Sequence, residues 1–261
     1  MSYFNHENLN IYYEEIGSGE PLLLINGLGG DTRGWAPLIE HLKNKFHVIS
    51  YDMRCAGQSD KPKEQITIHQ LAEEALALIQ HLGLKRVHVL AHSMGGMIAM
   101  DLALNHPDLI DKLFLISTAP SLNRPYAVSE KILTLFHRID VSPELLAEVY
   151  ETVFGTNFKK KISIDDYIKA RMKDTNPQPT QAYLNQLRAT ELFDIYDSVA
   201  KIFQPACIVV GDQDKIIPPQ NSKWLSEKIP NSKLLVLKGI GHMLPIEATD
   251  ELSKIVEEIC L

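Results

Sequence analysis

The sequence predicts an α/β fold in which a mostly parallel sheet is flanked by helices on both faces. Three observations support this fold class: short apolar runs of strand length recur along the chain, helical patterns lie between them, and the two kinds of segment alternate from start to end. Parallel strands need right-handed crossover helices, which also cover both faces of the sheet. The alternation is therefore typical of such a sheet.

The first half of the chain contains the clearest strands. Residues 10–21, "NIYYEEIGSGEP", predict an antiparallel edge strand that ends in a Gly-rich turn. The next three runs are rich in Val, Ile and Leu and read "PLLLIN" (21–26), "FHVISY" (46–51) and "VHVLA" (87–91). Their continuous apolar character indicates strands that are covered on both faces.

Helical patterns connect these strands. Residues 35–42 and, more clearly, 68–82 carry apolar residues at helical spacing, with Thr67 in an N-cap position and Gly83 in a stop position. The second half of the chain predicts three further strands and a final helix, at 112–117, 207–211, 233–239 and 249–259.

The alternation stops between residues 121 and 200, where no strong strand run occurs. Four short amphipathic helices are expected there, at 129–139, 142–154, 163–172 and 180–190. Because this block lies between two predicted sheet strands, we interpret it as a helical lid and not as a separate domain. The core of the fold is then formed by residues 1–120 and 201–261.

Composition narrows the class of protein. The chain has 261 residues, 45% of them hydrophobic, and a formal net charge of -7, which does not favour binding to nucleic acid or to an anionic membrane. Its three cysteines are far apart and predict neither a disulfide framework nor a metal site. No apolar run reaches the ~18 residues of a spanning helix, and the N-terminus lacks a signal-peptide pattern. We expect a cytoplasmic protein.

The stretch "AHSMGG" (91–96) places Ser93 between a strand run and a helical pattern. Serine is a common N-cap, so Ser93 could simply begin the helix. It could also be a nucleophile, which needs a base beside it and N–H donors for the oxyanion. Small neighbours such as Gly95 and Gly96 permit the tight turn that such a nucleophile requires.

Two other segments favour the nucleophile. Asp212 and Asp214 follow the strand at 207–211, and His242 follows the strand at 233–239. The carboxyl ends of parallel strands meet at one edge of a sheet, so we expect Ser93, an aspartate and His242 to converge there. Their order along the chain is the one expected for a Ser–His–Asp triad on such a sheet.

With these motifs the chain resembles the α/β-hydrolase superfamily over nearly all of its length. "AHSMGG" is similar to the nucleophile elbow, "NGLGG" (26–30) to the oxyanion loop, and "GDQDKIIPP" and "GIGHMLPIE" to the acid and histidine loops. The resemblance implies an eight-stranded sheet with the lid inserted after the sixth strand. It also implies Ser93 as the nucleophile and His242 as the general base, then acid.

The resemblance assigns further roles. Asp214 would orient His242, because the family places the acid three residues after the glycine that ends the strand, and we expect Asp212 to be a turn residue that hydrogen-bonds locally. The backbone N–H groups of Leu28 and Met94 would form the oxyanion hole. His92 is expected to be a packing or hydrogen-bonding residue and not the base.

Three positions depart from the family pattern. Ala91 stands at a usual glycine, Asn26 stands where many relatives have histidine, and Cys55 takes a glycine position in "YDMRCAGQSD" (51–60). We interpret Cys55 as a partly buried structural cysteine and not as a reactive thiol. Because Ser93 stands where dehalogenases and epoxide hydrolases of this fold need an aspartate, those two activities are excluded.

The expected function is hydrolysis of a carboxylic ester, thioester or lactone through an acyl-enzyme. The overall pattern resembles small members of the family such as 3-oxoadipate enol-lactonases and pimeloyl-carrier methyl ester esterases, and it does not choose between them. The substrate would be a small acyl compound, free or carried on an acyl carrier protein, and the triad needs no metal or organic cofactor. One alternative is a carbon–carbon bond hydrolase or perhydrolase with the same triad, and another is a hydrolase-like receptor or signalling protein.

The lid region is expected to form the substrate pocket. Apolar side chains that could line it are those of Met97, Phe136, Leu146, Tyr150 and Phe154. Packing between lid helices is the alternative role for most of these side chains. No feature of the sequence indicates an oligomeric state.

Overall fold

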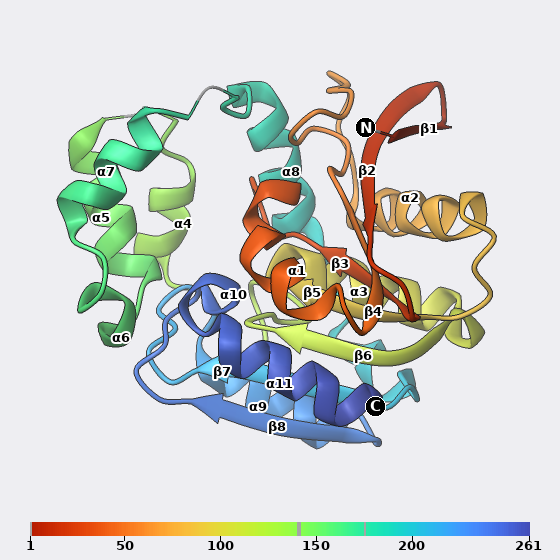
Figure 1. Ribbon diagram of the computed structural model, residues 1–261. Helices are drawn as coiled ribbons and strands as arrows, with labels where there is room; N and C mark the ends of the chain where they lie inside the picture. The colour runs from red at the N-terminus through yellow and green to blue at the C-terminus, as the bar shows by residue number, and fades with distance from the viewer. Residues whose placement is uncertain (1, 140–141, 175) are drawn as a thin grey trace.

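A sheet of eight strands runs through the centre of the protein, with strand order β1-β2-β4-β3-β5-β6-β7-β8 (Figure 1). The computed structural model describes residues 2–139, 142–174 and 176–261. β1 (Ser2–His6) pairs antiparallel with β2 (Leu9–Ile16), and β2 pairs antiparallel with β4. The remaining pairs are all parallel, which confirms the mostly parallel sheet.

The parallel strands are β3 (Glu20–Ile25), β4 (Phe46–Tyr51), β5 (Val87–His92), β6 (Ile110–Ile116), β7 (Ala206–Gly211) and β8 (Ser232–Leu237). The first five carry the buried core, whereas the residues of β8 are half-buried or exposed. All six residues of β5 and all six of β7 are buried, as expected for strands covered on both faces. The apolar runs of the sequence therefore locate these strands closely.

The N-terminal hairpin corrects the expectation for residues 10–21. β2 is antiparallel as predicted, but it is not the edge of the sheet, because β1 pairs with its outer side. Phe4 is the only buried residue of β1. A strand with one buried side chain has no apolar run, so the sequence pattern did not indicate it.

Helices cover both faces of the sheet (Figure 1). On one face α1 (Ala36–Leu42), α10 (Leu244–Glu247) and α11 (Thr249–Cys260) pack against an apolar cluster that contains Trp35 and Phe114. On the other face α2 (Ile68–His81), α3 (Met94–Asn105) and α9 (Pro219–Lys228) pack against a second, larger cluster. Short 3-10 helices lie at Thr32–Trp35, Pro107–Leu109 and Tyr196–Lys201.

The ends of α2 match the sequence signals. The Thr67 hydroxyl accepts the Gln70 N–H while the Gln70 side chain accepts the Thr67 N–H, which is a capping box. Gly83, just beyond the helix, has a φ of 67°, in the left-handed region that glycine occupies without strain.

A helical insertion follows β6, as expected. Within the described residues it contains α4 (Glu130–Phe136), α5 (Pro143–Val153), α6 (Thr156–Lys159), α7 (Ile164–Met172) and α8 (Thr180–Leu192). α4 to α7 gather at one end of the molecule, whereas α8 lies over the sheet beside the loops that follow β3 and β4 (Figure 1). No helix of the described residues has the length and apolar character needed to cross a membrane. The division into a core and a lid stays a prediction.

Candidate active site

Ser93 lies between β5 and α3 in a backbone conformation that few residues other than glycine adopt. Its φ is 56° and its ψ is -118°. The Ser93 N–H donates to the Ile116 carbonyl at 2.9 Å, and the Thr118 hydroxyl donates to the Ser93 carbonyl at 2.7 Å. A Cβ at Gly95 would lie 2.3 Å from the Ile25 carbonyl oxygen, so α3 begins in close contact with the end of β3. Such contacts enforce a strained conformation, which is common at functional sites.

The Ser93 side chain does not cap the helix that it precedes. Ser93 is the N-cap residue of α3 by position, but its hydroxyl makes no capping hydrogen bond. The hydroxyl instead lies 3.0 Å from Nε2 of His242. Of the two interpretations of "AHSMGG", the geometry therefore favours a serine that faces a base.

His242 lies between Ser93 and Asp214. Its Nδ1 is 2.9 Å and 3.1 Å from the two carboxylate oxygens of Asp214, which also accepts the N–H groups of Ile216 and Ile217. An ionised carboxylate only accepts hydrogen bonds, so we assign the imidazole proton to Nδ1 and leave Nε2 free to accept the serine hydroxyl. His242 and Asp214 are only 6% and 5% exposed. These contacts have the pattern of a Ser–His–Asp triad.

Asp212 has a different partner. It is exposed, and its carboxylate accepts the Gly239 N–H at 2.7 Å. The expectation of a local hydrogen bond is wrong, because Gly239 lies 27 residues further along the chain. Asp212 therefore joins the loops that follow β7 and β8, while Asp214 is the carboxylate that contacts His242.

The loop after β3 approaches Ser93 closely. A Cβ at Gly27 would lie 3.0 Å from the Cβ of Ser93, so glycine permits this approach. Leu28 follows Gly27, and Met94 is the first residue of α3. Within the described part of the chain, neither the Leu28 nor the Met94 N–H has a hydrogen-bond partner. Both donors are free for an oxyanion, although their role stays a prediction.

His92 supports the histidine loop from the end of β5. Its Nε2 donates to the His242 carbonyl at 2.8 Å, and the two ring centroids are 4.9 Å apart. This contact agrees with the expected packing and hydrogen-bonding role. Burial, followed by the charge of His242, lowers the pKa of His92 from 6.5 to about 3. His92 is therefore neutral when the protein is folded at neutral pH.

The buried neutral His92 predicts acid sensitivity. In the unfolded chain His92 takes up a proton below its ordinary pKa of 6.5, whereas in the folded chain it does so only near pH 3. Protonation therefore favours the unfolded chain, so the stability that comes from a neutral His92 is complete above pH 6.5 and is lost as the pH falls. We expect the free energy of unfolding of the wild type to fall by about 2 kcal/mol more than that of His92→Gln between about pH 7 and about pH 5.

Urea unfolding at the two pH values measures this difference. The glutamine side chain of His92→Gln keeps an N–H donor for the His242 carbonyl but does not titrate, so the variant isolates the protonation of the imidazole. Equal losses of stability in wild type and variant would contradict the assignment of His92 as a buried neutral histidine.

Glu247 is a site residue that the sequence analysis missed. Its carboxylate accepts the Gly241 N–H at 3.0 Å and the Gly155 N–H at 2.7 Å, and burial raises its pKa. The His242 N–H also donates to the Val153 carbonyl at 2.7 Å. The loop that holds His242 is thus bonded to the end of α5. The sequence signal that could have indicated Glu247 is an acidic residue within the otherwise apolar segment "MLPIEA" (243–248).

Two of the predicted pocket residues belong to an aromatic cluster. Tyr150 and Phe154 contact Phe158 and Tyr167, and the rings of Phe154 and Phe158 stack at 4.1 Å. These contacts are packing between the inserted helices, the alternative role for such side chains. The other three predicted pocket residues are buried or half-buried: Met97, Leu146 and Phe136. Whether any of the five lines the substrate pocket stays a prediction.

Two of the three departures from the family pattern, Cys55 and Ala91, fit the local structure. Cys55 has a φ of 74°, the left-handed conformation for which glycine is favoured, and it is fully buried. Burial raises the pKa of its thiol to about 11, so the thiol is protonated and a structural cysteine is the better interpretation. Ala91 is buried and pairs with Ile25 and Leu115 in regular strand register. In the described segments, no three His, Cys, Asp or Glu side chains are grouped as metal ligands would be.

Comparison with known proteins places this geometry in a wider context. Residues 20–249 match a family model described as the alpha/beta hydrolase fold. The chain is 29% identical over 236 residues to a Pseudomonas savastanoi pv. phaseolicola protein named "Putative carbamate hydrolase RutD", and the match covers 85% of this chain and 86% of that relative.

Solved structures show the same architecture. The enol-lactonase from Burkholderia xenovorans LB400 superposes with a TM-score of 0.84 at 24% identity, covering 98% of both chains. The meta-cleavage product hydrolase from Pseudomonas fluorescens IP01 superposes with a TM-score of 0.86 at 20% identity, covering 99% of this chain and 96% of that one. At such identities the likeness shows the fold and leaves the substrate open.

Proposed function

The chain belongs to the alpha/beta hydrolase fold family, and on that premise we propose that it is a serine hydrolase of carboxylic esters, thioesters or lactones. One observation carries this proposal. The Ser93 hydroxyl, at a strained strand-to-helix turn, lies 3.0 Å from His242 Nε2, and His242 is held in turn by Asp214 at 2.9 Å. This is the relation that a nucleophile, its base and an orienting carboxylate require.

The proposed reaction begins at the substrate carbonyl. Ser93 Oγ attacks the carbonyl carbon while His242 Nε2 takes the hydroxyl proton, and Asp214 stabilises the imidazolium that forms. The oxyanion is stabilised by the N–H groups of Leu28 and Met94 and by the N-terminus of α3. His242 then gives its proton to the leaving group, and an acyl-enzyme remains on Ser93. Water, activated by His242, releases the acid and restores the hydroxyl.

The site supports a substrate with an activated carbonyl group but does not distinguish between the kinds of acyl compound. The triad acts on an activated carbonyl, a feature that esters, thioesters and lactones share. We propose a small acyl compound as the substrate, free or carried on an acyl carrier protein. The relatives include a protein named "Putative carbamate hydrolase RutD" and an enol-lactonase, so carbamates and enol-lactones belong in the substrate panel. Carbon–carbon bond hydrolysis remains the second candidate, because the fold is shared with a meta-cleavage product hydrolase.

Labelling with a fluorophosphonate probe tests the proposal. Wild type is expected to be labelled at one site, and Ser93→Ala to remain unlabelled. Turnover is then measured on p-nitrophenyl esters of increasing acyl length, thioesters, lactones, carbamates and vinylogous diketones. Labelling with diketone turnover alone would favour the carbon–carbon hydrolase. A wild type that is neither labelled nor active on any of these compounds would overturn the enzymatic assignment and favour a receptor role.

A further inference from the structure

A buried amide side chain connects α8 to the oxyanion loop. Gln186 is fully buried, and both ends of its side chain are used. Its Oε1 accepts the Gly29 N–H at 3.2 Å, and its Nε2 donates to the Arg54 carbonyl at 3.1 Å. Gln178 adds a second amide, which donates to Gln186 Oε1 at 3.0 Å and to the Cys55 carbonyl at 2.6 Å. A buried amide is costly unless its polar atoms are paired, so these contacts define one arrangement.

The loop that Gln186 contacts is a tight turn. The Gly30 N–H donates to the Gly27 carbonyl at 3.1 Å, and Gly29 has a φ of 73°. A positive φ at the third residue is the pattern of a type II turn, in which Leu28 and Gly29 are the central residues. The Gly29 N–H belongs to the peptide between these two residues. A hydrogen bond to it therefore selects the orientation of that peptide and restrains Leu28.

The two sides of this turn face different partners. On one side Gly27 packs against Ser93, where a Cβ would come within 3.0 Å of the serine Cβ. On the other side Gln186 holds Gly29. The turn is thus held between the proposed nucleophile and α8, and a loss of the second contact would let the Leu28 N–H move away from the reacting carbonyl.

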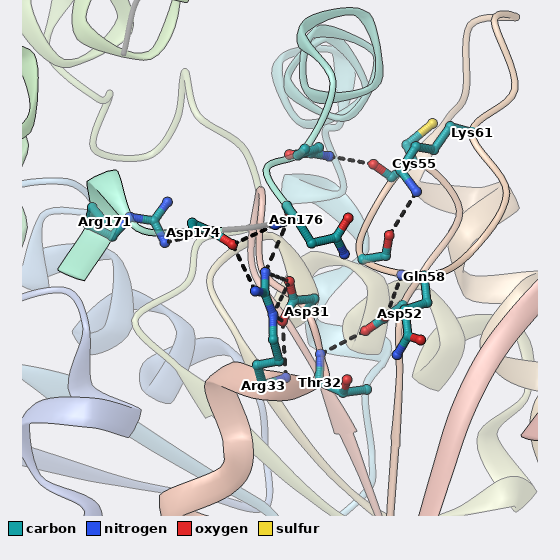
Figure 2. Close-up of polar contacts among 12 residues, drawn as sticks. Asp31, Thr32, Arg33, Asp52, Cys55, Gln58, Lys61, Arg171, Asp174 and Asn176 are labelled. Atoms are coloured by element: carbon teal, nitrogen blue, oxygen red, sulfur yellow. Dashed lines mark hydrogen bonds and ion pairs between the residues drawn. The ribbon is translucent and has the colours of Figure 1, made fainter. Parts of the chain in front are cut away.

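The rest of the loop is held independently of Gln186. The Asp52 carboxylate accepts the Thr32 and Gln58 N–H groups at 2.7 Å each, and Arg33 pairs with Asp31 and Asp174 (Figure 2). These contacts begin beyond the turn and do not include Gly29. Removal of the Gln186 amide is therefore expected to disturb the turn itself while the segment after it keeps its position.

Anchoring of α8 does not depend on Gln186 either. The adjacent Asn185 is 6% exposed, and its side-chain N–H₂ group is within 3.1–3.3 Å of the carbonyls of Pro62, Lys63 and Glu64. Both neighbouring amides thus contact the loop that follows β4, Gln186 at Arg54 and Asn185 at residues 62–64. Of these two amides, Gln186 is the one that also accepts a hydrogen bond from the proposed oxyanion loop, at Gly29.

We propose that Gln186 is a positioning residue that holds the Leu28 N–H toward the substrate carbonyl oxygen. This inference rests on the proposed hydrolase function. If Gln186 has this role, the oxyanion hole is complete only when α8 is docked. Gln186 would act through Leu28 and would touch neither the substrate nor the reacting atoms. An interaction of this kind stabilises the transition state more than the ground state, so its loss should lower kcat more than it raises KM.

The test compares Gln186→Met with Asn185→Leu on an ester substrate. We expect Gln186→Met to lower kcat by about 10- to 100-fold, since complete loss of one oxyanion donor costs about 100- to 1000-fold. KM should change by less than about threefold, and the affinity of a boronic acid transition-state analogue should fall in parallel with kcat. Asn185→Leu should lower the melting temperature comparably but keep kcat within about threefold of wild type.

A second variant separates positioning from folding. Gln186→Glu keeps an acceptor for the Gly29 N–H and loses the donor to the Arg54 carbonyl, so its kcat should lie closer to wild type than that of Gln186→Met. Two results would overturn this inference without affecting the proposed function. One is an equal loss of kcat in Gln186→Met and Asn185→Leu, and the other is a kcat of Gln186→Glu as low as that of Gln186→Met. A wild type that neither reacts with the fluorophosphonate probe nor turns over any compound of the substrate panel would overturn the proposed function and the inference with it.

Discussion

Replacing Ser93 by alanine is expected to lower kcat for ester hydrolysis by about 10⁵- to 10⁶-fold, because the attacking oxygen is removed. The change deletes one half-buried hydroxyl whose hydrogen-bond partner in the structure is His242. Folding should therefore persist. Steady-state kinetics on the best substrate of the panel measure the loss, and thermal unfolding shows whether the fold is retained.

His242→Ala provides the matched control for the same unit. The loss of kcat should be of similar size, and the double variant should lose little more than either single variant, because residues that act as one unit are not additive. Multiplicative losses in the double variant would mean that Ser93 and His242 act in separate steps. That result would contradict the proposed triad.

Asp214→Asn is expected to lower kcat by about 10⁴-fold at neutral pH. Asparagine at this position can turn its N–H₂ group toward His242 Nδ1, which favours the tautomer with the proton on Nε2. Nε2 could then no longer accept the proton of Ser93, although the two atoms would still lie near 3.0 Å apart. The geometry would be retained while the base is lost.

Asp212→Asn is the control for this second prediction. Asp212 is exposed and accepts the Gly239 N–H, and the side-chain oxygen of asparagine can accept the same bond. Its kcat should stay within about threefold of wild type, as expected for a surface substitution away from the site. If the two variants rank the other way in kcat, the assignment of Asp214 as the orienting acid is wrong.

The sequence predicts the fold best where the chain has to exclude water. β4, β5 and β7 carry nearly unbroken runs of buried residues, so the apolar runs give their bounds to within about one residue. The capping box at Thr67 and the left-handed Gly83 also have local chemical signatures. β1 and α6 lack such signals, because β1 buries only Phe4 and α6 has only four residues.

The convergence of Ser93, Asp214 and His242 could be predicted for a topological reason. Loops after parallel strands meet at one edge, so Ser93, Asp214 and His242 are brought together by strand order alone. The supporting residues could not be found in this way. Gln186 and Glu247 are polar side chains on helices, and residue type alone does not tell a buried amide or carboxylate from an exposed one. Their partners are mostly backbone N–H and carbonyl groups, which leave no trace in the sequence.

The junction between α5 and the loop that holds His242 limits which segments of related proteins can be grafted into this chain. A Cβ at Gly155 would lie 2.4 Å from the Gly239 carbonyl oxygen, and a Cβ at Gly241 would lie equally close to the Val153 carbonyl oxygen. A chimera that imports foreign inserted helices must therefore keep both glycines, or the crossing of the two backbones is lost. For protein engineering, the practical graft boundaries lie outside this crossing.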